Sequence, residues 1–195
     1  MDTQQLSLNK RYTYADYLTW LDDKRRELID GFINLMTPVP ARKHQDISMQ
    51  MSIIFGNYLF IKNTCKVYSA PFDVRLPKSK EETDDAKVYT VVQPDLSIIC
   101  DPSKLDDKGC IGAPDLIVEI LSPSTSKKDL SVKYKIYEQA GVKEYWLVSP
   151  NDENISVFVL DNTGKYQLNG MYGGDMKIKV SIFKDLEISL EDIFI

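Results

Sequence analysis

The sequence predicts a single α/β (α+β) domain in which a mixed central β-sheet is flanked by helices. Its 195 residues, 43% of them apolar, are enough for one sizeable hydrophobic core and too few for two full-sized domains. Residues 95–100 and 115–121 form nearly continuous apolar runs, which are typical of central strands covered on both faces. A strand, a helix and a strand are expected at 115–121, 126–140 and 144–148, an order that favours a right-handed crossover between parallel strands. We therefore expect one domain over residues 1–195.

An N-terminal helix and a hairpin are expected within residues 12–37. Thr13 is a suitable cap for a short helix over residues 14–21. In residues 27–36, the pair Asp30–Gly31 lies between apolar flanks and predicts a tight hairpin turn.

The core of the domain is expected over about residues 41–148. It begins with a long helix at 41–62, in which apolar residues recur at helical spacing. The residues of this apolar face are Ile47, Met51, Ile54, Phe55, Tyr58 and Leu59. Two strands are expected next, at 66–76 and 89–100, before the strand, helix and strand described above.

The helix expected at 126–140 carries signals at both ends. Ser126 with Asp129 three residues later resembles a capping box at its start. Gly141 provides a left-handed stop at its end.

The C-terminal part, residues 154–195, is expected to extend the central sheet with antiparallel strands at 155–160 and 177–183. Residues 189–195 are apolar and acidic and predict a short closing helix. The charged stretch 78–87 has almost no apolar side chain and predicts a solvated loop inside the domain.

Composition excludes several classes of protein and site. The chain has 24 basic and 29 acidic residues, a net charge of −5, so no overall positive field draws it to nucleic acid. Three cysteines without a close pair argue against a disulfide framework and a cysteine-type zinc site, and a single histidine excludes zinc sites that need two. The chain starts without a signal-like segment and lacks the roughly 18-residue apolar run of a membrane span. We expect a cytoplasmic protein with no membrane contact.

Two acidic residues interrupt apolar strands, Asp95 after Pro94 and Glu119 within residues 115–121. A buried charge is costly unless it is paired or binds a metal. Side chains on adjacent strands can converge on one ion, and carboxylate oxygens suit Mg²⁺ or Mn²⁺. The alternative is structural: Asp95 caps a turn after Pro94, and Glu119 pairs with a lysine or arginine of the core.

These acids lie in segments that resemble the Uma family of small restriction-endonuclease-like proteins, long of unknown function and common in cyanobacteria. The resemblance rests on residues 92–101 (VQPDLSIICD), 113–125 (APDLIVEILSPST) and 140–148 (AGVKEYWLV), and on Asp129, Lys133 and Tyr137. With upstream matches, it spans roughly residues 12–165. The family belongs to the PD-(D/E)XK nuclease superfamily. This membership implies a core of helix, three strands, helix and strand.

The resemblance also implies roles for individual residues. Asp95 matches the aspartate of the superfamily motif and Glu119 its second acid, and these two with the carbonyl of Ile120 would hold Mg²⁺ or Mn²⁺. The lysine position of the motif falls on Leu121, which departs from the nuclease pattern. In the superfamily this lysine can migrate to the following helix, which makes Lys133 the candidate.

Three further assignments have plain alternatives. Lys133 could form an ordinary surface pair with Asp129, four residues earlier. Glu27 matches a third acid that the family usually keeps, but it could pair with Arg25 or Arg26. His44 could contact phosphate or carry a proton. It could also be a partly buried histidine without a catalytic task.

Asp115 lies four residues before Glu119 on the same strand, about 13 Å away, which is too far to share one ion. We therefore expect a structural role for Asp115.

The segment after the strand of Glu119 could bind phosphate. Ser124, Thr125 and Lys127 offer hydroxyls, a positive charge and free backbone N–H groups near a helix start. Five lysines lie between residues 122 and 143, a local basic excess that a nuclease would need. They are Lys127, Lys128, Lys133, Lys135 and Lys143.

The expected function is metal-dependent endonuclease cleavage of DNA, or of RNA, by a homodimer. The apolar run 146–148 and the late strands could support the dimer. The alternative is a catalytically inactive binding or assembly module with a nuclease fold, which Leu121 and the acidic net charge favour.

Overall fold

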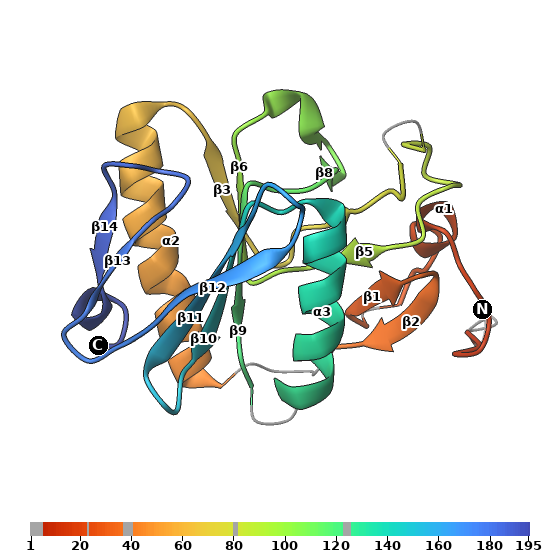
Figure 1. Cartoon of the computed structure of the whole chain (residues 1–195). Helices are drawn as coiled ribbons and strands as arrows, with labels where there is room; N and C mark the ends of the chain where they lie inside the picture. Colours follow the sequence, from red (N-terminus) through yellow and green to blue (C-terminus); the bar gives the residue numbers. More distant parts are fainter. Residues whose placement is uncertain (1–5, 23, 37–40, 80–81, 123–125) are drawn as a thin grey trace.

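The structure contains two six-stranded sheets that lie side by side. The computed structural model describes residues 6–22, 24–36, 41–79, 82–122 and 126–195, and for residues 126–130 only the backbone. The central sheet has the strand order β12-β11-β10-β9-β6-β3, and the second sheet has the order β2-β1-β5-β4-β8-β7 (Figure 1). The predicted α/β (α+β) class with a mixed central sheet is thus confirmed.

The central sheet is built from β3 (Lys66–Ser69), β6 (Leu96–Ile99), β9 (Leu116–Ile120), β10 (Glu144–Ser149), β11 (Asn154–Leu160) and β12 (Tyr166–Gly173). Neighbouring strands are antiparallel except for β9 and β10, which are parallel. Helix α3 (Ser126–Ala140) connects these two strands, as the strand–helix–strand order predicts.

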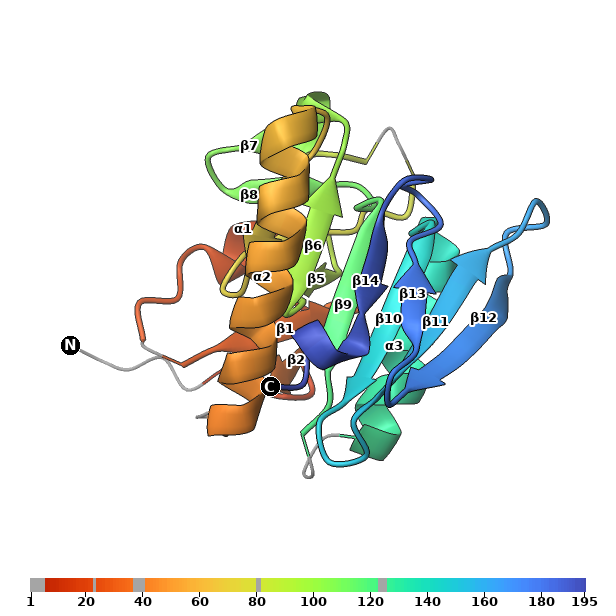
Figure 2. The same cartoon turned by 90° about the vertical axis from the view of Figure 1, so that its left-hand side faces the viewer.

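Each face of the central sheet is covered by a helix. On one face lies α2 (Arg42–Lys62), which packs Met51 and Phe55 against strand residues such as Trp146. The small sheet of β13 (Lys177–Lys179) and β14 (Glu187–Ser189) covers the same face. On the other face lie α3 and part of the second sheet (Figure 2). Burial of each large apolar side chain stabilises this arrangement by roughly 1.5–3 kcal/mol.

We did not predict the second sheet. Two strands that we expected to be continuous are each divided, with one half in the central sheet and the other half in the second sheet. Its strands are β1 (Arg26–Ile29), β2 (Phe32–Leu35), β4 (Val74–Arg75), β5 (Val91–Val92), β7 (Leu105–Asp106) and β8 (Gly109–Ile111). The expected strand 66–76 divides into β3 and β4 around Pro71, and the expected strand 89–100 divides into β5 and β6 around Pro94. Proline has no N–H for the strand ladder, so pairing ends there and the chain can change sheets.

The N-terminal elements follow the sequence signals. Helix α1 (Tyr14–Tyr17) is shorter than predicted and begins with a capping box between Thr13 and Asp16. The hairpin of β1 and β2 turns at Asp30 and Gly31, which have φ values of 50° and 88°. Positive φ at both positions is what a tight two-residue turn requires.

The C-terminal prediction was partly wrong. Strand β11 extends the central sheet as expected, but β13 pairs with β14 and not with that sheet. The strand next to β11 is β12, whose polar sequence hides it from a search for apolar alternation. The expected closing helix is a single 3₁₀ turn at Leu190–Asp192.

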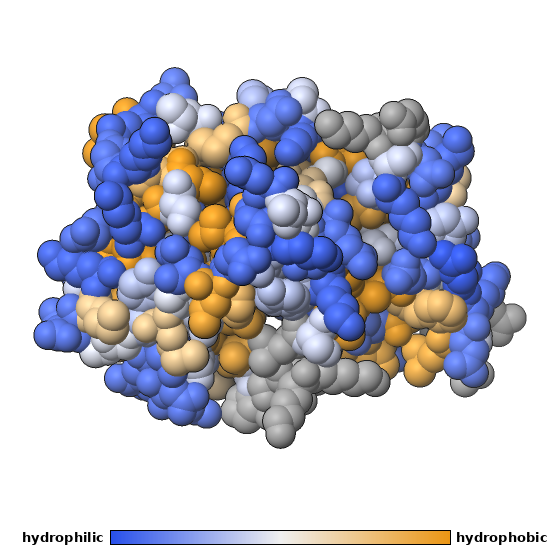
Figure 3. Space-filling model, in the orientation of Figure 1, coloured by the Kyte–Doolittle hydropathy of each residue, from blue (hydrophilic) through white to orange (hydrophobic). Residues whose placement is uncertain are grey.

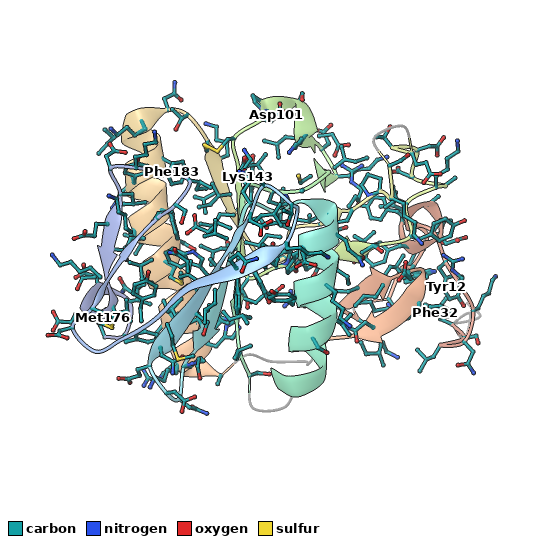
Figure 4. All side chains as sticks on the ribbon, in the orientation of Figure 1. Tyr12, Phe32, Asp101, Lys143, Met176 and Phe183 are labelled. Atoms are coloured by element: carbon teal, nitrogen blue, oxygen red, sulfur yellow. A yellow bond between two sulfur atoms is a disulfide. The ribbon has the colours of Figure 1, made fainter. Side chains whose placement is uncertain are left out.

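The cysteine prediction was also wrong. Cys65 and Cys100 form a disulfide near the end of α2, visible as a yellow bond in Figure 4, while Cys110 is free and buried. Lys66 of β3 lies opposite Ile99 of β6, so strand pairing brings together two cysteines 35 residues apart. Disulfides are typical of oxidising compartments, so cysteine usage no longer argues for the cytoplasm.

Two expectations about surfaces have clear outcomes. Trp146 and Val148 have no exposed surface, so these two side chains belong to the core. Among the described residues, no helix is long and apolar enough to cross a membrane.

Candidate active site

Three side chains from three elements meet at a buried lysine, and we call them the Lys133 cluster: Lys133 of α3, Glu119 of β9 and Glu27 of β1. The Nζ atom of Lys133 lies 2.9 Å from Oε1 of Glu119 and 2.9 Å from Oε1 of Glu27. The exposed fractions of the three side chains are only 11%, 12% and 2%. The charges therefore interact in an environment with little water.

Strand alternation explains why Glu119 faces Lys133. Val118 and Ile120 point into the core beneath α2, so Glu119 between them points to the face covered by α3. On α3, Lys133 and Tyr137 are four residues apart and share one side of the helix. The Tyr137 hydroxyl donates to Oε1 of Glu119 at 2.6 Å. Lys133 and Tyr137 thus hold the same carboxylate oxygen.

Glu27 is held by groups of the second sheet. Its Oε1 accepts the backbone N–H of Gln93 at 2.9 Å, and its Oε2 accepts from Nδ2 of Asn34 at 3.2 Å. The alternative partners of Glu27 were wrong: Arg26 pairs with Asp22, and Arg25 donates to the Gln93 side chain at 3.1 Å. Because neither arginine binds Glu27, its carboxylate can pair with Lys133.

Asp95 lies at the point where the chain leaves the second sheet and enters β6. Its Oδ2 accepts the backbone N–H of Ile120 at 2.7 Å, and its Oδ1 lies 3.3 Å from Nε2 of His44 at the start of α2. Leu96 is paired with Val118, so Asp95 lies next to the end of β9 that carries Glu119. The proline that ends β5 therefore also brings Asp95 to the carboxylates.

Acidic side chains outnumber basic ones around Lys133. The pKa of Glu119 is raised to about 7, because burial and the charges of Asp95 and Glu27 outweigh the lowering by Lys133. Burial alone would lower the pKa of Lys133, but Glu119 and Glu27 raise it well above its usual value. Lys133 is therefore a permanent cation that compensates for only part of the nearby negative charge.

His44 adds a second positive charge when it is protonated. Burial lowers the pKa of His44, but the hydrogen bond and charge of Asp95, with Glu119 and the Ile120 carbonyl, outweigh burial and raise it. Asp95 thus stabilises the charged form of His44.

Several expected site residues lie elsewhere or outside the described part of the chain. Ser124, Thr125 and the side chain of Lys127 are not among the described residues. The surface-pair alternative for Lys133 was wrong, because Lys133 is buried between two glutamates. Asp115 instead accepts the Cys100 N–H at 2.8 Å and pairs with Lys143 at 2.7 Å.

Figure 4 shows Lys143 near the top of the molecule, the end at which β9 begins. Asp115 is therefore far from the Lys133 cluster and has the structural surroundings that its position in the sequence suggested. Lys135 is exposed on α3.

The donor set for a metal consists of two acids. Among the described residues, no group of three or more histidine, cysteine, aspartate and glutamate side chains is close enough to hold an ion. The charge of Asp95 acts to raise the pKa of Glu119, so the two acids are close together. One or two carboxylates are what Mg²⁺ commonly uses alongside waters and phosphates. The carbonyl of Ile120 faces His44, while its N–H is taken by Asp95.

Sequence reasoning missed the residues that support the acids. Tyr137, Gln93 and Asn34 each donate a hydrogen bond to Glu119 or Glu27. Tyr137 was part of the family resemblance but was given no role, although it is four residues after Lys133. For Gln93 the signal was its position before the Pro94–Asp95 pair.

Comparisons with known proteins identify the family of the chain. The Uma2 family, described as "Putative restriction endonuclease", matches residues 14–191. An uncharacterized protein from Synechocystis is 28% identical over 163 residues, which are 82% of this chain and 80% of that protein.

A solved structure shares the fold. The crystal structure of a "putative nuclease belonging to DUF820" from Anabaena variabilis has a TM-score of 0.72 at 20% identity, covering 94% of this chain and 97% of that chain. The family resemblance noted in the sequence is confirmed, and the chain belongs to the Uma2 family of restriction-endonuclease-like proteins.

Proposed function

We propose that this protein is a metal-dependent endonuclease that hydrolyses phosphodiester bonds of DNA. One observation carries the proposal: Lys133 reaches Glu119 from the helix that follows β9, at 2.9 Å. In this proposal, Lys133 takes the role of the lysine that is absent at Leu121, because it lies beside the same acid.

The residues fit a divalent cation such as Mg²⁺ or Mn²⁺, held by Asp95, Glu119 and the Ile120 carbonyl. The three proposed ligands are all oxygen atoms, and the site carries more carboxylates than its cations balance. When bound, such an ion activates water and neutralises the charge that develops on the phosphate.

The protein's own side chains supply orientation and charge. Lys133 stays protonated, so it cannot act as a base, and its role is to orient the attacking water and stabilise negative charge near the phosphate. Glu27 positions Lys133 through their 2.9 Å contact. Tyr137 fixes the orientation of Glu119.

The phosphate contacts belong to the same proposal. His44 is next to Asp95 and has a raised pKa, so an imidazolium could face the phosphate there. In the sequence, Ser124, Thr125 and Lys127 come after Glu119 and before Lys133. A helix start with hydroxyls and a lysine suits a phosphate group.

A cleavage assay tests the proposal. DNA and RNA substrates are incubated with Mg²⁺ or Mn²⁺ and with the unaltered chain, Asp95→Ala or Lys133→Met. We expect metal-dependent cleavage by the unaltered chain and a loss of about 100-fold or more in both variants. Asp101→Ala is the control, because Asp101 is an exposed acid at the far end of the molecule (Figure 4).

Cleavage that persists in Asp95→Ala would contradict the assignment. Leu121 at the lysine position favours a second candidate, an inactive binding module with a nuclease fold. That candidate predicts binding of labelled DNA or RNA without any cleavage, whichever metal is supplied.

A further inference from the structure

The half-buried side chain of Arg25 lies at the rim of the candidate site. Arg25 directly precedes β1 and is two residues before Glu27. Its Nη2 and Nε atoms donate to Oε1 of Gln93 at 3.1 Å and 3.3 Å, and Gln93 is two residues before Asp95. The hairpin that begins at β1 lies beside α3, the helix that carries Lys133 (Figure 1). Arg25 is thus placed where the chain passes from the second sheet to the central sheet and the site begins.

The charge of Arg25 is not balanced by an acid in the described part of the chain. The other three cations around the site, Lys133, His44 and Arg26, each pair with at least one carboxylate. Within the described ranges, the guanidinium of Arg25 hydrogen-bonds to a neutral group, the side-chain amide of Gln93. A guanidinium that is oriented but not neutralised keeps its charge for an anion.

Buried groups fix the amide that orients Arg25. The Nε2 atom of Gln93 donates to Oδ1 of Asp73 at 2.8 Å, and Oδ2 of Asp73 accepts from the Tyr14 hydroxyl at 2.9 Å. Because the NH₂ group of Gln93 is bonded to Asp73, its oxygen faces Arg25. The backbone N–H of the same Gln93 donates to Glu27 at 2.9 Å. One buried residue therefore holds both an acid of the site and this arginine.

A nucleic-acid substrate would need such a cation here. The chain has a net charge of −5, and Lys133 compensates only part of the negative charge of the acids around it. Figure 3 shows that hydrophilic residues cover most of the face on which α3 lies. A bound divalent cation acts at the scissile phosphate, so neighbouring phosphates need a local positive charge of their own. The planar fork of a guanidinium matches two oxygens of a phosphate.

We propose that the guanidinium of Arg25 binds a backbone phosphate of the DNA strand, next to the phosphate that is cleaved. The choice of DNA as the ligand rests on the proposed function. The scissile phosphate belongs at Asp95, Glu119 and Lys133, so a cation at the rim of the site meets a neighbouring phosphate instead. Arg25 is thus a substrate-binding residue.

Binding of a fluorescently labelled DNA duplex, measured by anisotropy at several salt concentrations, tests the assignment. Ca²⁺ replaces Mg²⁺ to limit cleavage, because its looser coordination suits the reaction less well. Arg25→Met should weaken binding about 10-fold and lower the slope of log affinity against log salt by about one. Arg25→Lys keeps the charge but loses the fork, so it should keep the slope and weaken binding by only about 3-fold.

Lys24→Met is the matched control, because it removes the same charge from the preceding residue, whose side chain is exposed. It should change the dissociation constant by less than about 2-fold, since salt screens an exposed charge. Circular dichroism checks that each variant is folded.

A folded Arg25→Met variant with the affinity and the salt slope of the unaltered chain would overturn the assignment of Arg25. An equal loss of affinity in Lys24→Met would do the same. DNA cleavage by the unaltered chain in either case would leave the proposed function standing. Conversely, binding that depends on Arg25 without any cleavage in Mg²⁺ or Mn²⁺ would support this contact and contradict the endonuclease.

Discussion

Two clusters of charged residues in this protein have a similar composition but differ in the balance between positive and negative charges. In the second sheet, Arg75 contacts Asp106 at 2.5 Å and Asp85 at 3.4 Å, and Lys108 also pairs with Asp85. This Arg75 cluster has two cations for two acids. The Lys133 cluster has one cation for Glu27 and Glu119, with Asp95 close by.

The pKa values of the acids reflect this difference. Burial acts to raise the pKa of Asp106, but hydrogen bonds from Arg75 and from the N–H of Lys108 lower it below its usual value. Glu119 has a pKa raised to about 7. A balanced cluster stabilises the fold, whereas a buried excess of carboxylate is a cost that a functional site can require.

The largest expected effect comes from removing each central cation. Lys133→Met leaves two buried acids without a cation and should lower the free energy of unfolding by about 3–5 kcal/mol. Arg75→Met should lower it by only about 1–3 kcal/mol, because the Asp106 side chain is 46% exposed and water can solvate it. Urea unfolding measures both values. A larger loss for Arg75→Met than for Lys133→Met would contradict the comparison.

A smaller effect is expected from the hydroxyl that holds Glu119. Tyr137→Phe removes a buried 2.6 Å hydrogen bond to a carboxylate and should cost about 1.5–3 kcal/mol. Its control, Tyr134→Phe, removes a 3.4 Å contact to a carbonyl and should cost less than about 1 kcal/mol. Equal unfolding midpoints for the two variants would show that Tyr137 does not support the acid.

The two smallest expected changes in the free energy of unfolding have opposite signs. In chelator at neutral pH, Glu119→Gln removes a buried charge that Lys133, shared with Glu27, compensates only in part, and it should raise the free energy of unfolding by about 1 kcal/mol. Asp106→Asn removes a compensated, half-exposed charge and should lower it by about 0.5–1 kcal/mol. Thermal melts report the direction of each change, and two changes of the same sign would disprove the difference in balance.

Much of the candidate site could be predicted from local patterns. The apolar runs around Asp95 and Glu119 predict buried strands, and the strand–helix–strand order predicts that α3 covers β9. The family resemblance then singles out Lys133. Interruption of an apolar run by a charge is a signal that depends only on neighbouring residues, so the sequence displays it directly.

Features that depend on distant pairing could not be predicted. The Cys65–Cys100 disulfide follows from the alignment of β3 with β6, and the partners of Glu27 follow from a second sheet that two prolines create. Strand β12 was missed because an exposed edge strand needs few apolar residues. In each case the deciding contact joins segments far apart in the chain.

The most direct test of the charge account is a calorimetric titration of Mg²⁺ or Mn²⁺ into the metal-free protein. The account predicts binding to one site per chain, which Asp95→Asn abolishes and Asp106→Asn leaves unchanged. Absence of binding at millimolar metal, or binding that is lost in Asp106→Asn and kept in Asp95→Asn, would contradict it.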